Sequence, residues 1–534
     1  MARRLEAWFS ASVLAVLLLY WLAWCLIAPV TNADSQVYNL ARLWVIEGDG
    51  LFFNHSYNWN MQLIMPWSFD AVHYPFVRLG YGYALPSFLC LLGIMAILFT
   101  WARERGDAAD GLRACLGLLA MPMVVMQATT TKNDLVLAFC LLCWIEALRR
   151  YAGRPTRASI LLAALALAFA VGSKVTGLVY AGPAVALSAW VLRRRPAHVA
   201  WFAAALAAML VLNGSLEIYA NNWLQFGDWR GDPLVYRYNA NHDGWRGFLA
   251  NELRYAASIF DLQLLPSDLL RRIALLKFDA SQYLLQTLRL EGLGLMSLPW
   301  RPLSDDSLRR VMTVLPPTEV GATFGLTGTL LMTVAPVAIL VRRRVDFPAA
   351  LFAGGVAAQV LLALTLGWHP ANHRYLVVPA CLGWAGISLL IVPQRRRWAS
   401  LATAVFLAIC AVLVPFSVVR SPERLALGFR DRDALLSGFA RQMIARAQAW
   451  KQNGELPVVL TAGQAPVFHL YERLRPDLIS IPELSEEALV KLDDVHRRGA
   501  YWIVAIRTEV ELAGVVCEEP LATYDAQICL WRRR

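Results

Sequence analysis

Charged residues are scarce in this sequence. Only 17% of the 534 residues are charged, while 58% are hydrophobic and the mean hydropathy is +0.46. Soluble domains are about 45–50% apolar and about 25% charged. Because one core cannot absorb that excess, much of the apolar surface must face lipid. The composition therefore excludes a single soluble globular domain.

Several sequence signatures of chemistry are also lacking. The C-terminal region contains neither a Gly-rich phosphate loop nor a nucleophile elbow, and the histidines show no metal-ligand spacing. Most of the nine cysteines lie inside apolar runs, where Cys140 and Cys143 form a lone CxxC that favours packing over metal or redox chemistry. Cys517 and Cys529 lie in the C-terminal region, and whether they pair depends on its compartment.

The positive charge of the chain is distributed in a way typical of membrane proteins. The net charge is +11, but the arginines form short clusters between apolar runs rather than one basic surface. The positive-inside rule places such clusters on the cytoplasmic side of a bilayer. We therefore expect the lipid bilayer, and no nucleic acid, as a partner.

Apolar runs of spanning length recur along the chain and predict about eleven transmembrane helices. The first run is long enough to span and shows no evident cleavage signal, so we expect it to be retained. The predicted spans are Phe9–Pro29, Tyr81–Trp101, Leu112–Ala128, Asp134–Leu148, Ile160–Ser173, Val175–Leu192, Val199–Tyr219, Gly321–Val341, Ala349–Leu366, Tyr375–Val392 and Leu401–Val418.

The connections between these runs predict an orientation. Every alternate connection carries an arginine cluster, such as Arg193 to Arg195 and Arg342 to Arg344. Those connections and the N-terminus are then cytoplasmic, in the inner membrane of a bacterium. The segments Val30–Gly80 and Ala220–Val320 and the region from Arg420 onward would be periplasmic.

The predicted fold class is an all-α polytopic membrane protein with a small C-terminal α/β domain. Amphipathic helices are expected in the outer segments, one around Val37–Val45 with Asp34 or Ser35 as its cap, and two at Gly247–Phe260 and Leu269–Leu288. The expected domains are residues 1–220 with a first periplasmic loop at 30–80, a long periplasmic loop at 221–320, a second transmembrane module at 321–419, and the α/β domain at 420–534.

The C-terminal region alternates between strand and helix patterns. It is expected to be a lid or a docking surface. Strands are predicted at Leu456–Thr461, Leu478–Pro482, Tyr501–Ile506 and Ala526–Trp531, and helices at Pro466–Leu474 and Glu486–Arg498.

Polar residues gather at the predicted outer ends of the spans. Asp34 follows the first span, Asp134 begins the fourth, and Lys174 separates the fifth and sixth. His369, Asn372, His373 and Arg374 fill the connection before the tenth span. Charged groups near lipid are costly, so each is a candidate functional residue. One membrane face carries them all, which suits a reaction on a lipid-linked substrate.

Several short elements resemble the GT-C membrane glycosyltransferases of the type A fold. This group holds the protein O-mannosyltransferases and the lipid A aminoarabinose transferase, and the bacterial branch labelled family 39 or RgtA/B/C/D-like is the most similar. The matching elements are the acidic residue in Ala33–Ser35, the polar start of the fourth span in Gln127–Leu135, the Lys-containing turn Gly172–Gly177, the stretch Asn222–Asp228, and His373–Pro379. The resemblance covers roughly the first 380 residues.

The resemblance implies an inverting transfer of sugar from a polyprenyl-phosphate donor to a periplasmic acceptor, which is a cell-envelope glycan, a lipid or a protein. Asp34 would be the general base, because it would lie within reach of the acceptor proton. Lys174 and Arg374 would bind the phosphate that gains charge as it leaves. Asp134 and Asn133 would orient the acceptor or a divalent metal, Mg or Mn, whose requirement stays open.

Further contacts to sugar or lipid are assigned to His55, His73, His373 and Tyr375, with no metal ligand identified. Each candidate also has a structural interpretation: Asp34 and Asp134 as helix caps, Lys174 and Arg374 as residues reaching for headgroups, and the histidines as interface residues.

Three other function classes remain as alternatives. These are a secondary transporter, a membrane-anchored scaffold, and the more closely related O-antigen ligase or polymerase. No internal repeat supports a transporter. A scaffold does not require charged residues at four separate span ends.

Overall fold

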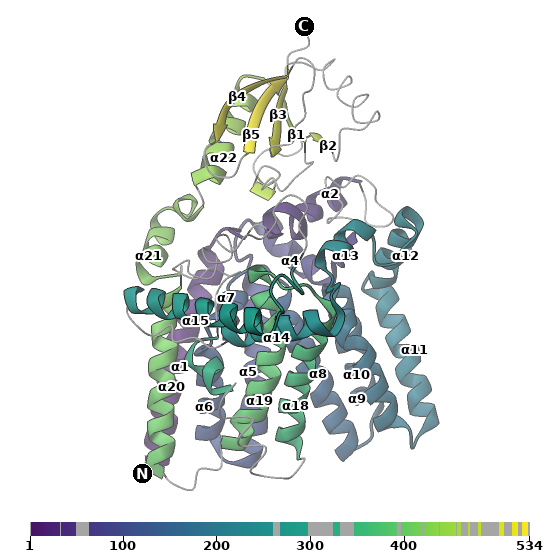
Figure 1. Ribbon diagram of the computed structural model, residues 1–534, viewed down its shortest axis with the longest axis vertical. Coiled ribbons are helices and arrows are strands. Elements are labelled where there is room, and N and C mark those ends of the chain that lie inside the picture. Colours follow the sequence, from purple (N-terminus) through teal and green to yellow (C-terminus); the bar gives the residue numbers. More distant parts are fainter. Residues whose placement is uncertain are drawn as a thin grey trace. The chain divides into compact units, whose positions relative to one another are not determined.

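The structure is a computed structural model of the whole chain (Figure 1). The residues that it describes are 2–32, 34–49, 64–259, 267–296, 324–331, 346–391, 397–418, 420–436, 438–454, 456–460, 468–469, 472, 479–481, 501–506, 515–521 and 526–531.

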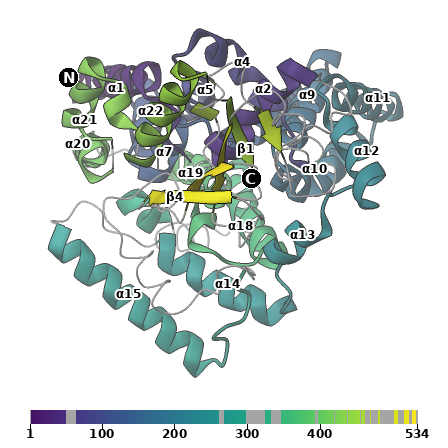
Figure 2. The same ribbon diagram turned by 90° about the horizontal axis from the view of Figure 1, so that it is seen from above.

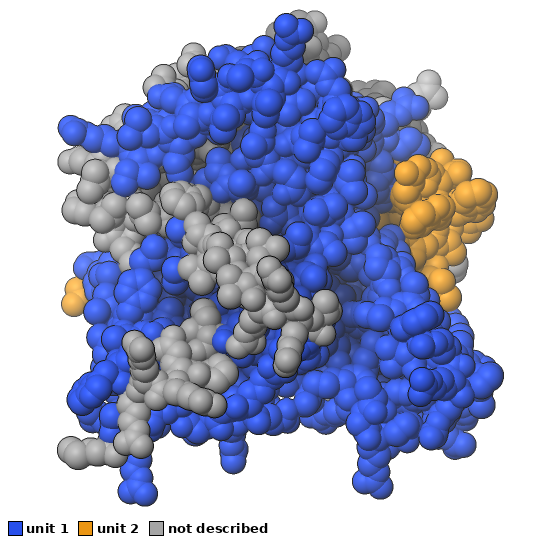
Figure 3. Space-filling model, turned by 60° about the horizontal axis from the view of Figure 1, so that its bottom comes forward, with its two compact units in different colours: residues 1–25, 84–213, 233–425 blue, residues 26–83, 214–232, 426–534 orange. Residues whose placement is uncertain are grey.

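The chain divides into two compact units, which Figure 3 colours separately. Unit 1 comprises residues 1–25, 84–213 and 233–425. Unit 2 comprises residues 26–83, 214–232 and 426–534. Unit 2 therefore joins the first predicted outer loop to the C-terminal region, although these segments are far apart in the sequence.

Unit 1 is built from helices. They are α1 (Ala2–Ile27), α5 (Leu85–Arg105), α6 (Ala108–Leu119), α7 (Pro122–Ala128), α8 (Asp134–Gly153), α9 (Arg157–Ser173), α10 (Thr176–Leu192), α11 (Pro196–Leu212), α13 (Pro233–Asn239), α14 (Gly244–Ile259), α15 (Ser267–Thr287), α18 (Phe347–Thr365), a 3-10 helix (Pro370–Leu376), α19 (Val377–Ile391) and α20 (Arg397–Ser417).

The described helices support a membrane protein but not the full number of predicted spans. By length and composition, four are able to cross a membrane, namely α1, α5, α18 and the part of α20 from Trp398 to Ser417. The number reaches six if each of two bent helix pairs counts as one span, and α9 and α10 are shorter apolar helices. The eleven predicted spans are thus not confirmed, and most of Gly321–Val341 lies outside the described residues.

Two runs that were predicted as continuous spans are broken in the structure. Leu112–Ala128 is wrong as a single helix, because α6 and α7 meet at an angle of 83°. Pro122 begins α7, and proline cannot continue a preceding helix without losing a hydrogen bond. Val199–Tyr219 is likewise divided into α11 and α12 (Ser215–Phe226), which meet at 68°. Gly214 between them has a φ of 74°, which glycine adopts readily.

The interior of unit 1 lies where α5, α6, α8 and α19 pack on one another. Trp384 on α19 donates its indole N–H to the backbone oxygen of Ala114 on α6, at 2.8 Å. This close approach requires Gly117, since a Cβ there would collide with the Trp384 ring. On the neighbouring side, Trp144 on α8 donates to the hydroxyl of Ser188 on α10 at 2.9 Å. Indole groups thus pair with oxygens across the helix interfaces.

The two long amphipathic helices of unit 1 lie near the ranges predicted for them. Figures 1 and 2 show α14 and α15 beside each other and running across the axes of α18 and α19. The connection after α18 is fixed by backbone hydrogen bonds, from the Gly367 N–H to the Asn239 oxygen (2.7 Å) and from the Trp368 N–H to the Gly294 oxygen (2.6 Å). The segment leading to Arg374 is therefore held in place from both sides.

Unit 2 contains helices and a five-stranded sheet, in the strand order β2-β1-β3-β5-β4. Strand β1 pairs in parallel with β2 and β3, while β5 pairs antiparallel with β3 and β4. The elements that lie wholly or mainly in unit 2 are a π-helix (Ser35–Asn39), α2 (Ala41–Asp49), α4 (Ser68–Leu79), α12, α21 (Pro422–Arg430), a 3-10 helix (Asp433–Leu435), α22 (Gly438–Gln452), β1 (Leu456–Leu460), β2 (Ile479–Ile481), β3 (Tyr501–Ile506), β4 (Val515–Leu521) and β5 (Ala526–Trp531).

Four of these strands fall in or next to the predicted ranges, and β4 was not predicted. The two helices predicted between the strands lie almost entirely outside the described residues, so the α/β character of this region stays a prediction. The register of β4 and β5 places Cys517 directly opposite Cys529.

Candidate functional site

Asp134 is the first residue of α8, and its side chain is 4% exposed. The segment before it, Thr129 to Lys132, is buried even though it is polar. Asn133 donates its side-chain N–H to the backbone oxygen of Ser173 at 2.6 Å, which joins the start of α8 to the end of α9. The polar start predicted for this helix therefore lies inside unit 1.

Lys174 extends from the end of α9 toward Asp134. The backbone at Lys174 is extended (φ −160°, ψ 141°), which ends the helix. Its ammonium group donates a hydrogen bond to Asp134 Oδ1 and lies 4.3 Å from the centre of the Tyr375 ring. A side chain that only reached for headgroups would not be 12% exposed with a buried partner. The contacts favour a site over that interpretation.

Arg374 joins this group from the connection between α18 and α19. It lies in the 3-10 helix Pro370–Leu376, and its Nε is 3.9 Å from Asp134 Oδ2. Its guanidinium carbon lies 5.2 Å from the centre of the Tyr375 ring. Lys174 and Arg374 thus both contact the Tyr375 ring and the Asp134 carboxylate.

Asp134, Lys174, Arg374 and Tyr375 are named here the Asp134 cluster. These four residues come from three separate parts of the sequence, and the structure brings them together. Cation–π contacts contribute about 2 kcal/mol when they are desolvated, which offsets part of the repulsion between the two cations.

Three buried oxygen atoms near the cluster have no hydrogen-bond partner within the described ranges. They are Asp134 Oδ2 and the hydroxyls of Tyr180 on α10 and Tyr255 on α14. Tyr180 lies within electrostatic range of Asp134 and Tyr255, and Tyr255 within range of Tyr375. Because an unsatisfied buried polar group costs about 1–3 kcal/mol, these atoms are a signal of a ligand site. Burial raises the pKa of Tyr255, so its hydroxyl stays protonated and can donate.

Sequence reasoning did not identify Tyr180 or Tyr255. Tyr180 stands alone among apolar residues, and no motif marks either tyrosine. For Tyr255 the available signal was its position beside Arg254, within the amphipathic helix predicted at Gly247–Phe260.

The histidines near the cluster are neutral. Burial, and then the nearby Lys277 and His369, lower the pKa of His373 to about 3. Burial, and then Arg374, lower the pKa of His369 to about 4. The ring of His373 lies 5.9 Å from that of Trp368. At neutral pH these imidazoles therefore add no positive charge to the surroundings of the cluster.

Asp34 belongs to unit 2, where it immediately precedes the π-helix Ser35–Asn39 and is partly buried. Its side chain makes no capping hydrogen bond. The backbone N–H of Ser35 is instead bonded to Asn32 Oδ1 at 2.8 Å, so the expectation that Asp34 or Ser35 caps this helix is wrong. Asp34 therefore does not cap this helix through its side chain, and its assignment as the general base stays a prediction.

Of the two histidines predicted in the first outer segment, His55 and His73, the structure describes only His73. His73 lies in unit 2, where it is fully buried, and its Nδ1 is 2.7 Å from the backbone oxygen of Tyr83. Burial lowers the pKa of His73 to about 4. These contacts are those of a structural residue. His55 lies outside the described residues.

No group of three or more His, Cys, Asp or Glu side chains with the geometry to hold a metal occurs in the described part of the chain. In the cluster, Asp134 is one carboxylate with two cationic neighbours, and this donor set does not suit Mg or Mn, which prefer several oxygen ligands. The residues at this site therefore do not fit the metal that the sequence left open.

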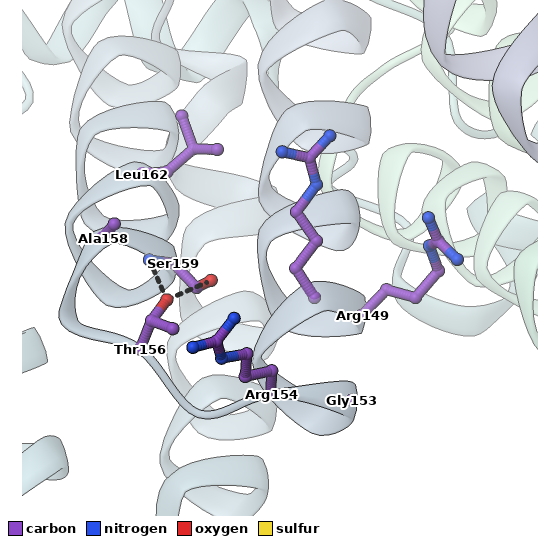
Figure 4. Close-up of a pocket in the computed structure, with 8 residues that line it drawn as sticks. Arg149, Gly153, Arg154, Thr156, Ala158, Ser159 and Leu162 are labelled. Atoms are coloured by element: carbon purple, nitrogen blue, oxygen red, sulfur yellow. Dashed lines mark hydrogen bonds between the residues drawn. The ribbon is translucent and has the colours of Figure 1, made fainter.

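A surface pocket of about 510 Å³ lies at the opposite end of α8 (Figure 4). It is lined by Arg149, Arg154, Thr156 and Leu162, among others. With a rise of about 1.5 Å per residue, this end lies roughly 25 Å along the helix from Asp134. The pocket is consequently separate from the Asp134 cluster.

Comparison with known proteins yields similarity in structure only. No known family profile matches the chain, and no curated protein matches it. Among solved structures it is similar to ArnT from Cupriavidus metallidurans bound to undecaprenyl phosphate, with 16% identity, a TM-score of 0.52, and coverage of 98% of this chain and 97% of that one. A structure of ArnT from Cupriavidus metallidurans in the apo state gives 15% identity and a TM-score of 0.47, over 98% and 97% of the two chains.

At this identity the likeness shows the fold alone. The fold of this chain is therefore like that of the ArnT structure bound to undecaprenyl phosphate, along nearly its whole length.

Proposed function

We propose that this protein is an inverting glycosyltransferase that moves a sugar from a polyprenyl-phosphate donor to a periplasmic acceptor at the bacterial inner membrane. The observation that carries the proposal is the Asp134 cluster, where Lys174 and Arg374 are held together beside buried, unpartnered oxygens. The likeness in fold to a protein bound to undecaprenyl phosphate supports the same ligand class.

The cluster would bind the phosphate of the donor. When the bond between sugar and phosphate breaks, negative charge grows on the phosphate oxygens, and fixed cations lower the energy of that transition state. Arg374 suits this role because its planar guanidinium can donate two parallel hydrogen bonds to a phosphate. Lys174 would exchange its contact with Asp134 for one with the phosphate, and Asp134 would then hold the cations in position.

The hydroxyls of Tyr180 and Tyr255 would donate to the phosphate or to the sugar. Both are buried and lack partners among the residues that the structure describes. A ligand that accepts hydrogen bonds from these two hydroxyls would offset the cost of burying them without partners. This favourable free energy is gained only when the ligand is bound. No step needs a metal ion.

Asp34 would be the general base that takes the proton from the acceptor nucleophile. The acceptor would attack the sugar carbon as the phosphate leaves on the opposite side, and a single displacement of this kind inverts the anomeric centre. The proton goes to the carboxylate of Asp34, and the bonding electron pair goes to the polyprenyl phosphate.

The test is release of polyprenyl phosphate by the purified protein, supplied with polyprenyl-phosphate sugars in membrane extracts. We expect release by the wild type and a loss on the order of 10²- to 10⁴-fold in Asp34→Asn, with folding intact. Equal release by both proteins would keep the transferase and remove Asp34 from its role. No release by the wild type, across a broad range of donors and acceptors, would overturn the proposed function.

A secondary transporter is the second candidate, and the two broken helix pairs favour it. Transporters bind substrates at discontinuous helices interrupted by Gly or Pro, and the breaks before Pro122 and at Gly214 have that character. Uptake of polyprenyl-linked sugar across a vesicle membrane, without release of polyprenyl phosphate, would distinguish this function from transfer.

A further inference from the structure

Unit 2 contains a contact between segments about 400 residues apart in the sequence. Phe468, His469 and Glu472, named here the C-terminal clamp, lie against the first outer loop, residues 26–83. We propose that this clamp positions the segment that carries Asp34, so that the C-terminal region takes part in the reaction as a support for the general base. The inference rests on the proposed function, because that function assigns the base to Asp34.

Phe468 anchors the clamp by packing. Its side chain is fully buried (0% exposed). Its ring meets Tyr83 edge to face with centroids 5.7 Å apart, and it stacks on Trp44 of α2 at 6.3 Å. Aromatic pairs at these distances contribute beyond the burial of area alone, which makes this residue the main apolar anchor of the contact.

His469 joins the anchor to the start of the loop. It is 3% exposed, with Nε2 at 2.8 Å from the backbone oxygen of Val30 and Nδ1 at 3.1 Å from Glu472 Oε2. Both ring nitrogens therefore face acceptors. Only a doubly protonated ring donates to both of them, and this form also pairs with the carboxylate of Glu472.

Glu472 joins the same network to the end of the loop. Its Oε1 accepts a hydrogen bond from the Tyr83 hydroxyl. Burial by itself would raise the pKa of Glu472, but hydrogen bonds from His469 and Tyr83 lower it. Arg432 lies over the Tyr83 ring at 5.0 Å and donates to the backbone oxygen of Gly80. The clamp thus ties the two ends of the loop, near Val30 and Tyr83, to each other.

The link to Asp34 is the carbonyl of Val30. This oxygen accepts hydrogen bonds from His469 and from the side chain of Gln36, the latter at 2.7 Å. Asp34 lies between these two anchored residues, Val30 and Gln36. Loss of His469 would leave the carbonyl with one donor and the turn around Asp34 with more freedom. Because misplacement of a reacting group by about 1 Å can lower a rate on the order of 100-fold, such freedom reduces turnover.

His469 and Phe468 make no contact with the reacting atoms in this account, so they are positioning residues. The variants that test them are His469→Ala, which removes both hydrogen bonds, and Phe468→Ala, which removes the anchor. Phe468→Leu keeps an apolar side chain of similar size and is the conservative variant. His242→Ala is the matched control, since His242 is an exposed histidine in unit 1 bonded only to the Arg237 carbonyl among the contacts described.

Two measurements on the full-length protein distinguish the clamp from the proposed function. Hydrogen–deuterium exchange of residues 30–36 reports the clamp without any need for substrate. Steady-state release of polyprenyl phosphate separates kcat from KM for the donor. We expect His469→Ala and Phe468→Ala to increase exchange in residues 30–36 and to lower kcat on the order of 10- to 100-fold, with KM unchanged within about twofold.

Phe468→Leu should recover most of the kcat, and His242→Ala should match the wild type in both measurements. Unchanged exchange in residues 30–36 of both alanine variants would overturn the clamp, whatever the activity. Increased exchange with wild-type kcat would overturn its positioning role. If the wild type shows no transfer, the proposed function fails and the positioning role fails with it, while the exchange result still decides whether the clamp holds the loop.

Discussion

Helix α8 carries a buried carboxylate near each end, and the two are satisfied very differently. Near its C-terminal end, Glu146 accepts hydrogen bonds on both oxygens, from Trp101 (2.6 Å), Arg149 (2.7 Å) and Arg150 (2.6 Å). At its N-terminal end, Asp134 accepts a hydrogen bond from Lys174 on Oδ1, while Oδ2 has the Arg374 Nε at 3.9 Å but no hydrogen-bond partner among the described residues. The residues are twelve positions apart on one helix, so the difference reflects their surroundings.

The difference separates a structural network from a binding site. A buried polar network that is complete stabilises the fold, whereas an incomplete one costs stability unless a ligand completes it. The Glu146 end also lies beside the surface pocket of Figure 4, where Arg149 and Arg150 are already paired with Glu146. The Asp134 end has two cations for one carboxylate, and open donors nearby. We therefore interpret only the Asp134 end as a site for an anionic substrate group.

The largest expected effect is on transfer when the cations are removed from the Asp134 end. The double variant Lys174→Met, Arg374→Gln should lower the rate of polyprenyl phosphate release on the order of 10³-fold or more, since each donor to developing charge contributes about 10²–10³-fold. The control Arg149→Gln, Arg150→Gln at the other end should keep the rate within about twofold. Circular dichroism checks that both proteins are folded. If Lys174→Met, Arg374→Gln transferred sugar at the wild-type rate, the Asp134 end would not be the binding site that sets it apart from the Glu146 end.

The second effect is on stability and belongs to the Glu146 end. Glu146→Ala should lower the free energy of unfolding by about 2 kcal/mol, because it removes the charged acceptor of a buried bond from Trp101 on α5 and of bonds from Arg149 and Arg150 within α8. Transfer should stay within about twofold of the wild type. Chemical denaturation in detergent measures the stability. A variant as stable as the wild type but inactive would reverse the roles assigned to the two ends.

The third effect comes from two tyrosines in opposite situations. Tyr255→Phe should lower transfer about tenfold, the loss of one hydrogen bond in the complex, while stability stays equal or rises because an unpartnered buried hydroxyl is removed. Tyr151→Phe is the matched control, since the Tyr151 hydroxyl bonds to His198 Nδ1 at 2.7 Å on the other side of unit 1. It should leave transfer unchanged and lower stability slightly. The same result for both variants would contradict the account.

The smallest effect is a pH dependence at the Asp134 end. His369 and His373 have pKa values lowered to about 4 and about 3, against about 6.5 in the unfolded chain. Between the folded-state and unfolded-state pKa values, the unfolded state binds more protons than the folded state. The contribution of the two neutral histidines to the free energy of unfolding is therefore complete above pH 6.5 and is lost as the pH falls toward 4. A Tm about 2–4 °C lower at pH 5 than at pH 7.5 is expected.

His373→Gln should reduce that dependence, since it keeps a neutral polar group that does not titrate in this range. His198→Gln is the control and should keep the pH dependence of the wild type. If His373→Gln retains the full loss of Tm, protonation of His373 does not account for it.

Much of the candidate site was predictable from the sequence, because polar residues at span ends are costly and stand out against apolar runs. Asp134, Lys174 and Arg374 were singled out in this way, Tyr375 was named as a sugar or lipid contact, and the four meet in space. Tyr180 and Tyr255 were not predicted, because a single tyrosine in a helix has no signature and its lack of a hydrogen-bond partner is a property of packing. The wrong capping residue at the π-helix has a similar cause, since Asn32 reaches Ser35 only in the folded loop.

The broken helices show where apolar run length fails as a predictor. Hydropathy registers the apolar residues of Leu112–Ala128 but not the turn before Pro122, where the backbone loses a donor. At Gly214 a side chain would also come within 2.8 Å of the Trp67 ring, which no local pattern reveals. Contacts between distant segments, such as the C-terminal clamp, lie equally beyond pattern analysis.

The most direct test of the central claim is the affinity of the purified protein for undecaprenyl phosphate, measured by native mass spectrometry in the wild type, in Lys174→Met with Arg374→Gln, and in Glu146→Gln. The account predicts specific binding by the wild type and by Glu146→Gln, and a loss of affinity on the order of 100-fold in the double variant. Equal affinity in all three proteins would contradict the claim that the Asp134 end of α8 holds the phosphate.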